Sequence, residues 1–362
     1  HDTFCWGDDV LEDLVHHGMI DEIWTLSDFH AYYVMNASHP RLRNFEVLRD
    51  HMWVTRNGIV KYFDEVDINA KDPNLFIFNA NMSKGLASLL NDVWPRVKQR
   101  IPEARLTVIG GHYKLGAAFA HGDEETEFMK IAGPHMNDDT ITFTGIISQR
   151  EVSEYCKKSS YFIYPAVLPE TYGISTVEAL YANTLLITCR FGALEETATP
   201  HSYYIDYAMT PNGVCPHIDA AAQVEKFVDL VVDVYNNPEE NLRRRLALND
   251  IKDLLGWEVT ALEWKHHIHS KLNLPLSKSE HQMVRYTKSK YHEMFERKWS
   301  CEEEWLAPKL PTEQKIVVIS PLYNAGDYAI KCINSVAAQD YENYEHWLVD
   351  DASTDDTSEK IK

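Results

Sequence analysis

The chain has 362 residues, of which 44% are hydrophobic and 25% are charged, and this is enough ordinary globular sequence for about two or three domains. Its formal net charge of −20 argues against a nucleic-acid-binding protein, because neutralising phosphates requires clustered Lys and Arg. The six cysteines include no C-x-x-C pair, so neither a zinc ribbon nor a disulfide framework is predicted, and no apolar run reaches the roughly eighteen residues of a transmembrane helix. We expect a reduced, cytoplasmic protein, and because the chain begins with neither Met nor a signal peptide, we expect it to be part of a longer one.

Residues 1–55 are predicted to be the last part of an α/β lobe. Residues 21–27 contain an acidic turn and a short strand, and the apolar side chains of residues 28–34 then have helical spacing. Asn57 and Gly58 follow as a strong turn signal.

Residues 56–275 alternate between buried strands and helices, which is typical of a lobe built on a parallel sheet. Strands are predicted at residues 74–79, 105–111, 141–148, 161–165 and 185–189. Helices are predicted from the spacing of Leu86, Leu89, Leu90, Val93 and Trp94, from the S-x-x-E pair of Ser148 and Glu151, and from the apolar face of residues 220–235. A histidine cluster in residues 257–272 lacks carboxylates at ligand spacing, so it is interpreted as a polar helix face and no metal is predicted.

The loop after the strand at residues 161–165 carries the strongest functional signal. Gly173 allows a ligand to approach the backbone closely, and Ser175 with a Glu three residues later is typical of a helix start. The amides of Gly173, Ile174 and Ser175 would form an anion site at that helix N-terminus, flanked by the carboxylates of Glu170 and Glu178. Because open α/β sheets bind ligands at the carboxyl ends of their strands, this pattern predicts a nucleotide-sugar diphosphate site. Two simpler interpretations stay open: Glu178 only completes a capping box, and Glu170 is a solvated loop residue.

The segment from Glu170 to Leu180 resembles the E-x7-E motif of retaining GT-B glycosyltransferases, specifically glycosyltransferase family four. The resemblance implies a Rossmann-like donor lobe in which Glu170 contacts the donor sugar and Glu178 binds the ribose hydroxyls. It also implies that Gly173 and Ile174 bind the diphosphate. A nucleotide-diphosphate sugar is then the donor, and no metal or other cofactor is expected for this lobe.

Other positions match the same family in the same order. Lys84, followed by Gly, matches the family's diphosphate-binding Lys-Gly pair and becomes a catalytic candidate beside Glu170, whereas Asn79 stands where the family has an Arg. Gly192 lies in a segment similar to the family's G-G-x-P-E loop. His1 resembles the His of an H-D pair that faces the sugar.

Two further glycine turns are expected beside the nucleotide. Gly110 and Gly111 end a predicted strand, where a loop without side chains can pass close to a ligand. Gly145 and Ile146 belong to a stretch similar to the family's F-x-G turn, which implies a place against the base.

Residues 276–314 are rich in both charge signs and end in a Pro-containing stretch, which predicts a partly helical linker. Residues 315–362 then resemble the first βαβ unit of glycosyltransferase family two, an inverting GT-A enzyme. The resemblance implies that Tyr323 and Asp351 contact a nucleotide base. A divalent metal, Mg²⁺ or Mn²⁺, is expected only in a complete GT-A domain, whose D-x-D motif these residues lack, so no activity is expected from this unit alone.

The predicted fold class is therefore α/β, with a GT-B Rossmann-like donor lobe, a partial N-terminal lobe and an incomplete GT-A unit. The resemblance implies a retaining hexosyltransferase that moves a sugar from a nucleotide-diphosphate donor to a glycan or lipid-linked acceptor, within a multidomain polysaccharide-building protein. Its location would be the cytoplasm or the membrane surface. Two alternatives stay open: a GT-B nucleotide-sugar epimerase, and a non-catalytic lobe that binds a nucleotide or holds neighbouring domains, which Asn79 favours.

Overall fold

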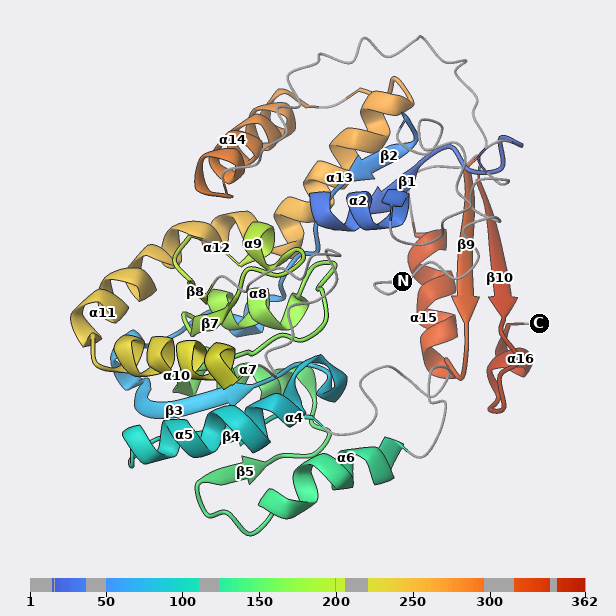
Figure 1. The fold of residues 1–362 in the computed structure, drawn as a ribbon. Helices are drawn as coiled ribbons and strands as arrows, with labels where there is room; N and C mark the ends of the chain where they lie inside the picture. Colours follow the sequence, from blue (N-terminus) through green and yellow to red (C-terminus); the bar gives the residue numbers. More distant parts are fainter. Residues whose placement is uncertain are drawn as a thin grey trace. The chain divides into compact units, whose positions relative to one another are not determined.

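The computed structural model describes residues 15, 17–36, 50–110, 124–198, 200–205, 221–275, 277–295, 316–338 and 344–361. The predictions for His1 and Gly111 therefore lie outside the described residues. The chain divides into two compact units, one comprising residues 1–264 and 279–300, the other residues 265–278 and 301–362. Figure 1 shows both units, and each is considered by itself below.

The first unit is built on a six-stranded parallel sheet with the order β5-β4-β3-β6-β7-β8. Its strands are β3 (Asp72–Phe78), β4 (Arg105–Val108), β5 (Ile141–Phe143), β6 (Ser159–Ile163), β7 (Leu185–Cys189) and β8 (Tyr203–Ile205). Every residue of β6 and β7 is buried, which agrees with their high content of apolar side chains. The chain moves outward from β3 to β5 and returns to β6 on the other side of β3, so the strand order reverses between β3 and β6. Ligands of such sheets bind at the carboxyl ends of the strands at this point.

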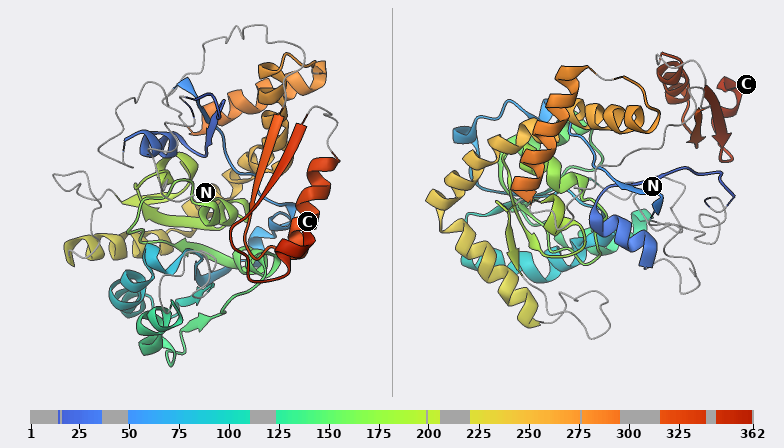
Figure 2. Two further views of the ribbon diagram at one scale, coloured as in Figure 1. Left: turned by 90° about the vertical axis from the view of Figure 1, so that its right-hand side faces the viewer. Right: turned by 90° about the horizontal axis from the view of Figure 1, so that it is seen from above.

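Helices cover both faces of this sheet (Figures 1 and 2). One set that packs together includes α5 and α10, and another includes α7, α8 and α12. The helices between Leu86 and Phe295 are α4 (Leu86–Ser88), α5 (Trp94–Arg100), α6 (Glu124–Ala132), α7 (Gln149–Lys158), α8 (Ile174–Tyr181), α9 (Leu194–Thr197), α10 (Ala221–Tyr235), α11 (Pro238–Ala247), α12 (Asn249–Leu255), α13 (Trp257–Lys271) and α14 (Lys278–Phe295), with short helical turns η1 (Lys61–Phe63), η2 (Ile68–Ala70), η3 (Met82–Lys84), η4 (Leu89–Val93) and η6 (Gly133–His135). Residues 265–271 of α13 and Lys278 of α14 belong to the second unit. The predicted apolar face of residues 220–235 is confirmed, because its members are all buried: Val224, Phe227, Val228, Val231 and Val232.

The N-terminal segment of this unit contains β1 (Ile23–Thr25), α2 (Asp28–Asn36) and β2 (Met52–Val54), and β1 pairs with β2 in parallel. The strand and helix predicted here are confirmed. The turn predicted at Asn57 and Gly58 is wrong, because the backbone forms no turn at these two residues. Gly58 serves close packing instead: a Cβ on it would lie 2.4 Å from the Cα of Trp257.

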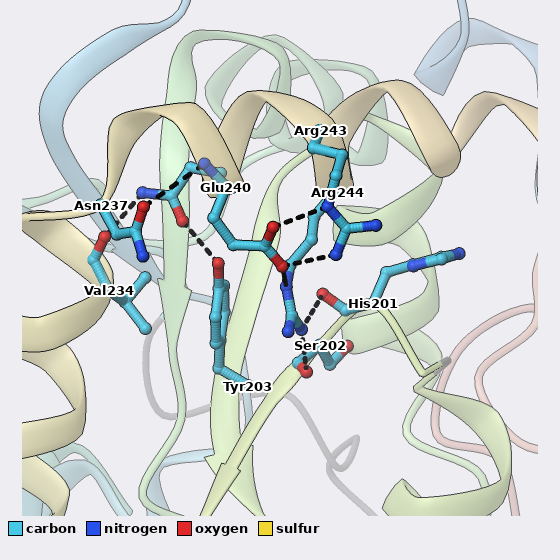
Figure 3. A network of polar contacts seen from close by, with 9 residues as sticks. His201, Ser202, Tyr203, Val234, Asn237, Glu240, Arg243 and Arg244 are labelled. Atoms are coloured by element: carbon cyan, nitrogen blue, oxygen red, sulfur yellow. Dashed lines mark hydrogen bonds and ion pairs between the residues drawn. The ribbon is translucent and has the colours of Figure 1, made fainter.

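A polar network attaches α11 to the edge strand β8 (Figure 3). The Glu240 carboxylate accepts hydrogen bonds from Arg243 and Arg244, which lower its pKa to about 2. Arg244 donates in turn to the carbonyls of His201 and Ser202, at 3.3 and 3.0 Å. The carboxylate therefore stays ionised at neutral pH, and Arg244 joins α11 to the residues that lead into β8.

The second unit contains β9 (Ile316–Leu322), α15 (Asp327–Ala337), β10 (Tyr344–Asp350) and α16 (Thr357–Lys360). The two strands pair in parallel with Ile316 opposite Tyr344. A parallel pair joined by a helix is a βαβ unit, as predicted for residues 315–362. None of the helices in the described part of the chain has the length and apolar character needed to cross a membrane.

Candidate functional site

The loop between β6 and α8 ends at Gly173, which has a left-handed backbone with φ +77° and is the N-cap of α8. The helix begins at Ile174, so the prediction that Ser175 starts it with a capping box is wrong. Glycine takes this position because a Cβ would lie 3.0 Å from Thr176 Oγ1, and because φ is positive. The second predicted box is confirmed, since Ser148 and Glu151 cap α7 reciprocally.

The amino end of α8 has the geometry of an anion site. The first amides of a helix lack intrahelical acceptors and carry partial positive charge. In α8 these first amides belong to the turn that starts at Gly173, and Ile174 and Ser175 in this turn are partly exposed. A bound diphosphate could therefore accept hydrogen bonds from this backbone.

Glu170 lies in the same loop and is only 7% exposed, so its interpretation as a solvated loop residue is wrong. Its two carboxylate oxygens have different partners: Lys84 Nζ donates to Oε2 at 2.6 Å, and the Tyr164 hydroxyl donates to Oε1 at 2.6 Å. Burial, and then the charge of Glu170, raise the pKa of Tyr164 well above its usual value, so the phenol remains a donor. The two residues predicted as catalytic thus form an ion pair.

Lys84 is brought to Glu170 by a close contact between two strand ends. It ends η3, which follows β3, and Asn81 caps that turn by accepting from the Ser83 amide at 2.9 Å. The next residue, Gly85, has φ +130°, and a Cβ on it would lie 2.3 Å from the carbonyl oxygen of Pro165, just after β6. Only glycine allows this approach. Asn79, which stands where the family has an Arg, is 3% exposed at the end of β3.

The Gly192 loop holds the backbone of Glu170. Gly192 has φ +62°, and a Cβ on it would lie 2.6 Å from the carbonyl oxygen of Glu170 and 2.8 Å from its nitrogen. The Ala193 amide donates to the same carbonyl at 2.8 Å. The position of the Glu170 carboxylate therefore depends on the absence of a side chain at Gly192.

We expect Gly192→Ala to destabilise the first unit and to displace Glu170. The matched control is Gly18→Ala, because Gly18 has nearly the same φ, +65°, but among the described residues no atom lies within 4 Å of its added Cβ. Both variants carry the backbone strain of about 1–2 kcal/mol, and Gly192→Ala adds overpacking of about 1–3 kcal/mol. Urea unfolding measures the difference, and equal losses in the two variants would contradict the role of this contact.

Several residues of this site were missed by the sequence analysis. Ser27 donates from Oγ to the carbonyl of Thr171 at 2.6 Å, and both oxygens of Glu196 accept from the first amides of α2, at 2.7 Å each. The N-terminal segment is thus bonded to the loop that carries Glu170 and to α9, which follows Gly192. Tyr164 was assigned only to a strand. In the sequence, Ser27 indicates only the start of a helix, and this local signal does not reveal its distant partner Thr171.

The predicted nucleotide turns meet each other. Gly110 donates its amide to the carbonyl of Gly145 at 3.0 Å, and their φ values are +98° and +65°. Gly145 is exposed, and the neighbouring Ile146 is 65% exposed. This arrangement leaves an apolar side chain in solvent at the carboxyl end of β5.

Glu178 lies on α8 and is 6% exposed. Its Oε1 accepts a hydrogen bond from Gln149 Nε2 at 2.6 Å, and the Gln149 Oε1 accepts from the Tyr62 hydroxyl at 2.5 Å. The interpretation of Glu178 as a capping-box partner is wrong, because Gly173 is the N-cap and no side chain caps the helix.

In the second unit, Tyr323 and Asp351 follow the carboxyl ends of β9 and β10, and the Asp351 amide donates to the carbonyl of Leu322 at 2.8 Å. The two residues therefore lie at the same edge of the parallel pair. Among the residues that the structure describes, no group of three His, Cys, Asp or Glu side chains is arranged to hold a metal ion.

Comparison with known proteins gives two family matches. Residues 62–253 match the family model described as glycosyl transferases group 1, and residues 317–362 match the model described as glycosyl transferase family 2. The pneumococcal O-GlcNAc transferase GtfA, solved in complex with UDP and GlcNAc, has a TM-score of 0.54 and 14% identity, over 73% of this chain and 48% of that one. Anabaena Alr3699/HepE, solved in complex with UDP-glucose, has a TM-score of 0.51 and 10% identity, over 73% of this chain and 68% of that one.

Curated relatives match over shorter stretches. The glycosyltransferase GlyG of Streptococcus pneumoniae is 46% identical over 44 residues, which is 12% of this chain and 15% of that protein. An uncharacterized glycosyltransferase of Rickettsia conorii is 44% identical over 54 residues, which is 15% of this chain and 9% of that protein. The chain thus covers only a small part of the length of these relatives.

Proposed function

The chain belongs to the glycosyl transferases group 1 family and has the α/β fold of GT-B glycosyltransferases, and from this premise we propose that it transfers a sugar from a nucleotide-diphosphate donor with retention. The observation that carries the proposal is the Lys84–Glu170 ion pair beside the amino end of α8. It places a cation, a carboxylate and helix amides together at the edge of the sheet where such folds bind ligands.

In the proposed reaction, the bond between the anomeric carbon and the phosphate oxygen breaks, and its electron pair leaves with the diphosphate. The acceptor hydroxyl forms a new bond to the anomeric carbon, and its proton passes to an oxygen of the leaving diphosphate. Positive charge develops on the sugar ring and negative charge on the leaving phosphate. Glu170 stabilises the first charge, while Lys84 and the amides of Gly173, Ile174 and Ser175 stabilise the second. No metal is needed for this distribution of charges.

The nucleoside is proposed to lie between the carboxylate of Glu178 and the turn formed by Gly110, Gly145 and Ile146. Glu178 accepts hydrogen bonds from the ribose, and the exposed side chain of Ile146 contacts the base. The solved relatives that contain UDP or UDP-glucose support testing a uridine nucleotide first. The acceptor is proposed to be a glycan or a lipid-linked glycan, at the cytoplasmic side of a membrane or in the cytoplasm.

Titration calorimetry with UDP-, GDP- and TDP-sugars tests the donor site in the chain itself. We expect one of them to bind, and Glu178→Ala to weaken that binding roughly 10- to 100-fold, because a hydrogen bond to a charged group contributes about 1.5–3 kcal/mol. Glu154→Ala is the control, since Glu154 is a half-exposed carboxylate on α7 that forms an ion pair with Lys157. No binding to any donor would contradict the proposal.

A second candidate function is a lobe that binds the nucleotide without turnover, or that holds neighbouring domains. The observation in its favour is Asn79, which supplies no charge where the family has a cation. Donor hydrolysis by the protein that contains this chain separates the two candidates: a rate above background that is lost in Lys84→Met supports transfer, and binding without hydrolysis supports the second candidate.

The βαβ unit at residues 315–362 is proposed to bind a nucleotide base through Tyr323 and Asp351, with a divalent metal only in a complete GT-A domain.

A further inference from the structure

Three side chains from three elements form a hydrogen-bonded line that ends on Glu178. The Tyr62 hydroxyl, on η1, donates to Gln149 Oε1 at 2.5 Å, and Gln149 Nε2, on the first turn of α7, donates to Glu178 Oε1 at 2.6 Å. Gln149 is exposed and Tyr62 partly exposed, whereas Glu178 is buried. The line therefore runs from the surface to a buried carboxylate.

The donors and acceptors in this line determine one orientation of the Gln149 amide. Burial, and then the negative charge of Glu178, raise the pKa of Tyr62, so its phenol is protonated and donates. A flipped amide would place its carbonyl oxygen against the Glu178 carboxylate and lose that hydrogen bond, whereas the Tyr62 hydroxyl can accept as well as donate. The amide thus presents its donor side to Glu178.

The backbone under Gln149 is also held in place. Ser148 caps α7, accepting from the Glu151 amide at 3.3 Å while the Glu151 carboxylate accepts from the Ser148 amide at 2.9 Å. On the other side, the Tyr62 ring stacks on Phe63, which is fully buried. An exposed glutamine normally keeps its rotamer freedom, and ordering one costs conformational entropy. Here both ends of the amide are bonded on a fixed backbone.

We propose that Gln149, oriented by Tyr62, is a positioning residue that directs the Glu178 carboxylate toward the ribose hydroxyls of the donor and so favours ribonucleotides over deoxyribonucleotides. This inference rests on the proposed function. Gln149 fixes one carboxylate oxygen, so the carboxylate plane is set before the ligand arrives. Pre-organisation of this kind lowers the entropic cost of ordering the side chain when the ligand binds.

Calorimetry with UDP and 2′-deoxy-UDP tests the inference, with GDP and 2′-deoxy-GDP in parallel. We expect the wild-type chain to prefer the ribonucleotide, and Gln149→Ala to weaken its binding about 3- to 10-fold while changing deoxyribonucleotide binding less than twofold. Tyr62→Phe should also lower the ratio of ribonucleotide affinity to deoxyribonucleotide affinity. Gln99→Ala is the control, because Gln99 is an exposed glutamine on α5, and it should leave both affinities unchanged.

The possible outcomes distinguish this inference from the proposed function. Equal weakening of both nucleotides by Gln149→Ala would show that Gln149 only ties α7 to η1, and would overturn the inference. Unchanged UDP binding in Gln149→Ala would overturn it as well, while leaving the donor site intact. If the wild-type chain binds no UDP-, GDP- or TDP-sugar, the proposed function fails and this inference fails with it. Binding of a TDP-sugar without binding of UDP or GDP would overturn this inference alone.

Discussion

Glu170→Gln is expected to lower sugar transfer by the protein that contains this chain roughly 10²–10³-fold, and to raise the affinity for UDP at the same time. The opposite directions follow from the ion pair. In the free protein Lys84 is bound to the Glu170 carboxylate at 2.6 Å, so part of its charge is already compensated when a diphosphate arrives. The isosteric amide removes this competition and one negative charge near the phosphates, but it cannot stabilise positive charge on the sugar.

The measurements are the rate of donor hydrolysis or transfer and the dissociation constant for UDP. We expect the affinity of Glu170→Gln to rise by about 3- to 10-fold, which corresponds to about 0.7–1.4 kcal/mol. Lys84→Met should lower both the affinity and the rate, because it removes the cation and leaves a buried carboxylate with the Tyr164 hydroxyl. Lys130→Met removes an exposed lysine of α6 that is also paired with a glutamate, and it should change neither quantity. A fall in UDP affinity in Glu170→Gln would contradict the competition between carboxylate and diphosphate.

Glu263→Ala is expected to destabilise the first unit by about 3–5 kcal/mol, because it leaves the buried charge of Arg56 without its partner. Arg56 Nη2 donates to Glu263 Oε1 at 2.7 Å, and the two side chains are 4% and 7% exposed. The guanidinium also lies over the ring of Tyr291, 4.2 Å from its centroid, and Thr287 donates to the same Glu263 oxygen at 3.3 Å. This pair joins the segment after β2 to α13 and α14.

Urea unfolding of Glu263→Ala, Arg56→Met, their double variant and the control Glu127→Ala tests the role of this ion pair. The double variant Arg56→Met with Glu263→Ala should recover part of the loss, since it contains no unpaired buried charge. Glu127→Ala breaks an exposed ion pair on α6 and should have no measurable effect. Additive losses in the double variant would show that the two side chains contribute independently, and would contradict the interpretation.

Much of the fold could be predicted because its signals are local. The strand at residues 185–189 was predicted with the observed bounds, since a fully buried strand is one continuous apolar run. The capping box of Ser148 and Glu151 was predicted because its partners are three residues apart. The same signal failed at Ser175. Gly173, in the left-handed conformation, is the N-cap instead, so the helix begins at Ile174 and Ser175 lies inside it.

The failure at Asn57 and Gly58 has a related cause. Glycine satisfies two different demands, a positive φ and a close approach, and the sequence does not say which one applies. At Gly58 the demand is the backbone of Trp257, which is far away along the chain. A turn signal alone could not distinguish these uses.

The sequence by itself determined the order of strands and helices, the candidate residues Glu170, Glu178 and Lys84, and the resemblance on which their roles depend. Only the tertiary structure decided that Lys84 and Glu170 form an ion pair across 86 positions, and that Gln149 is bonded to Glu178 across 29. The physical reason is the distance along the sequence over which each interaction acts. Apolar periodicity and caps act within a few residues, whereas these contacts exist only after the parallel strands have brought their carboxyl ends to one edge of the sheet.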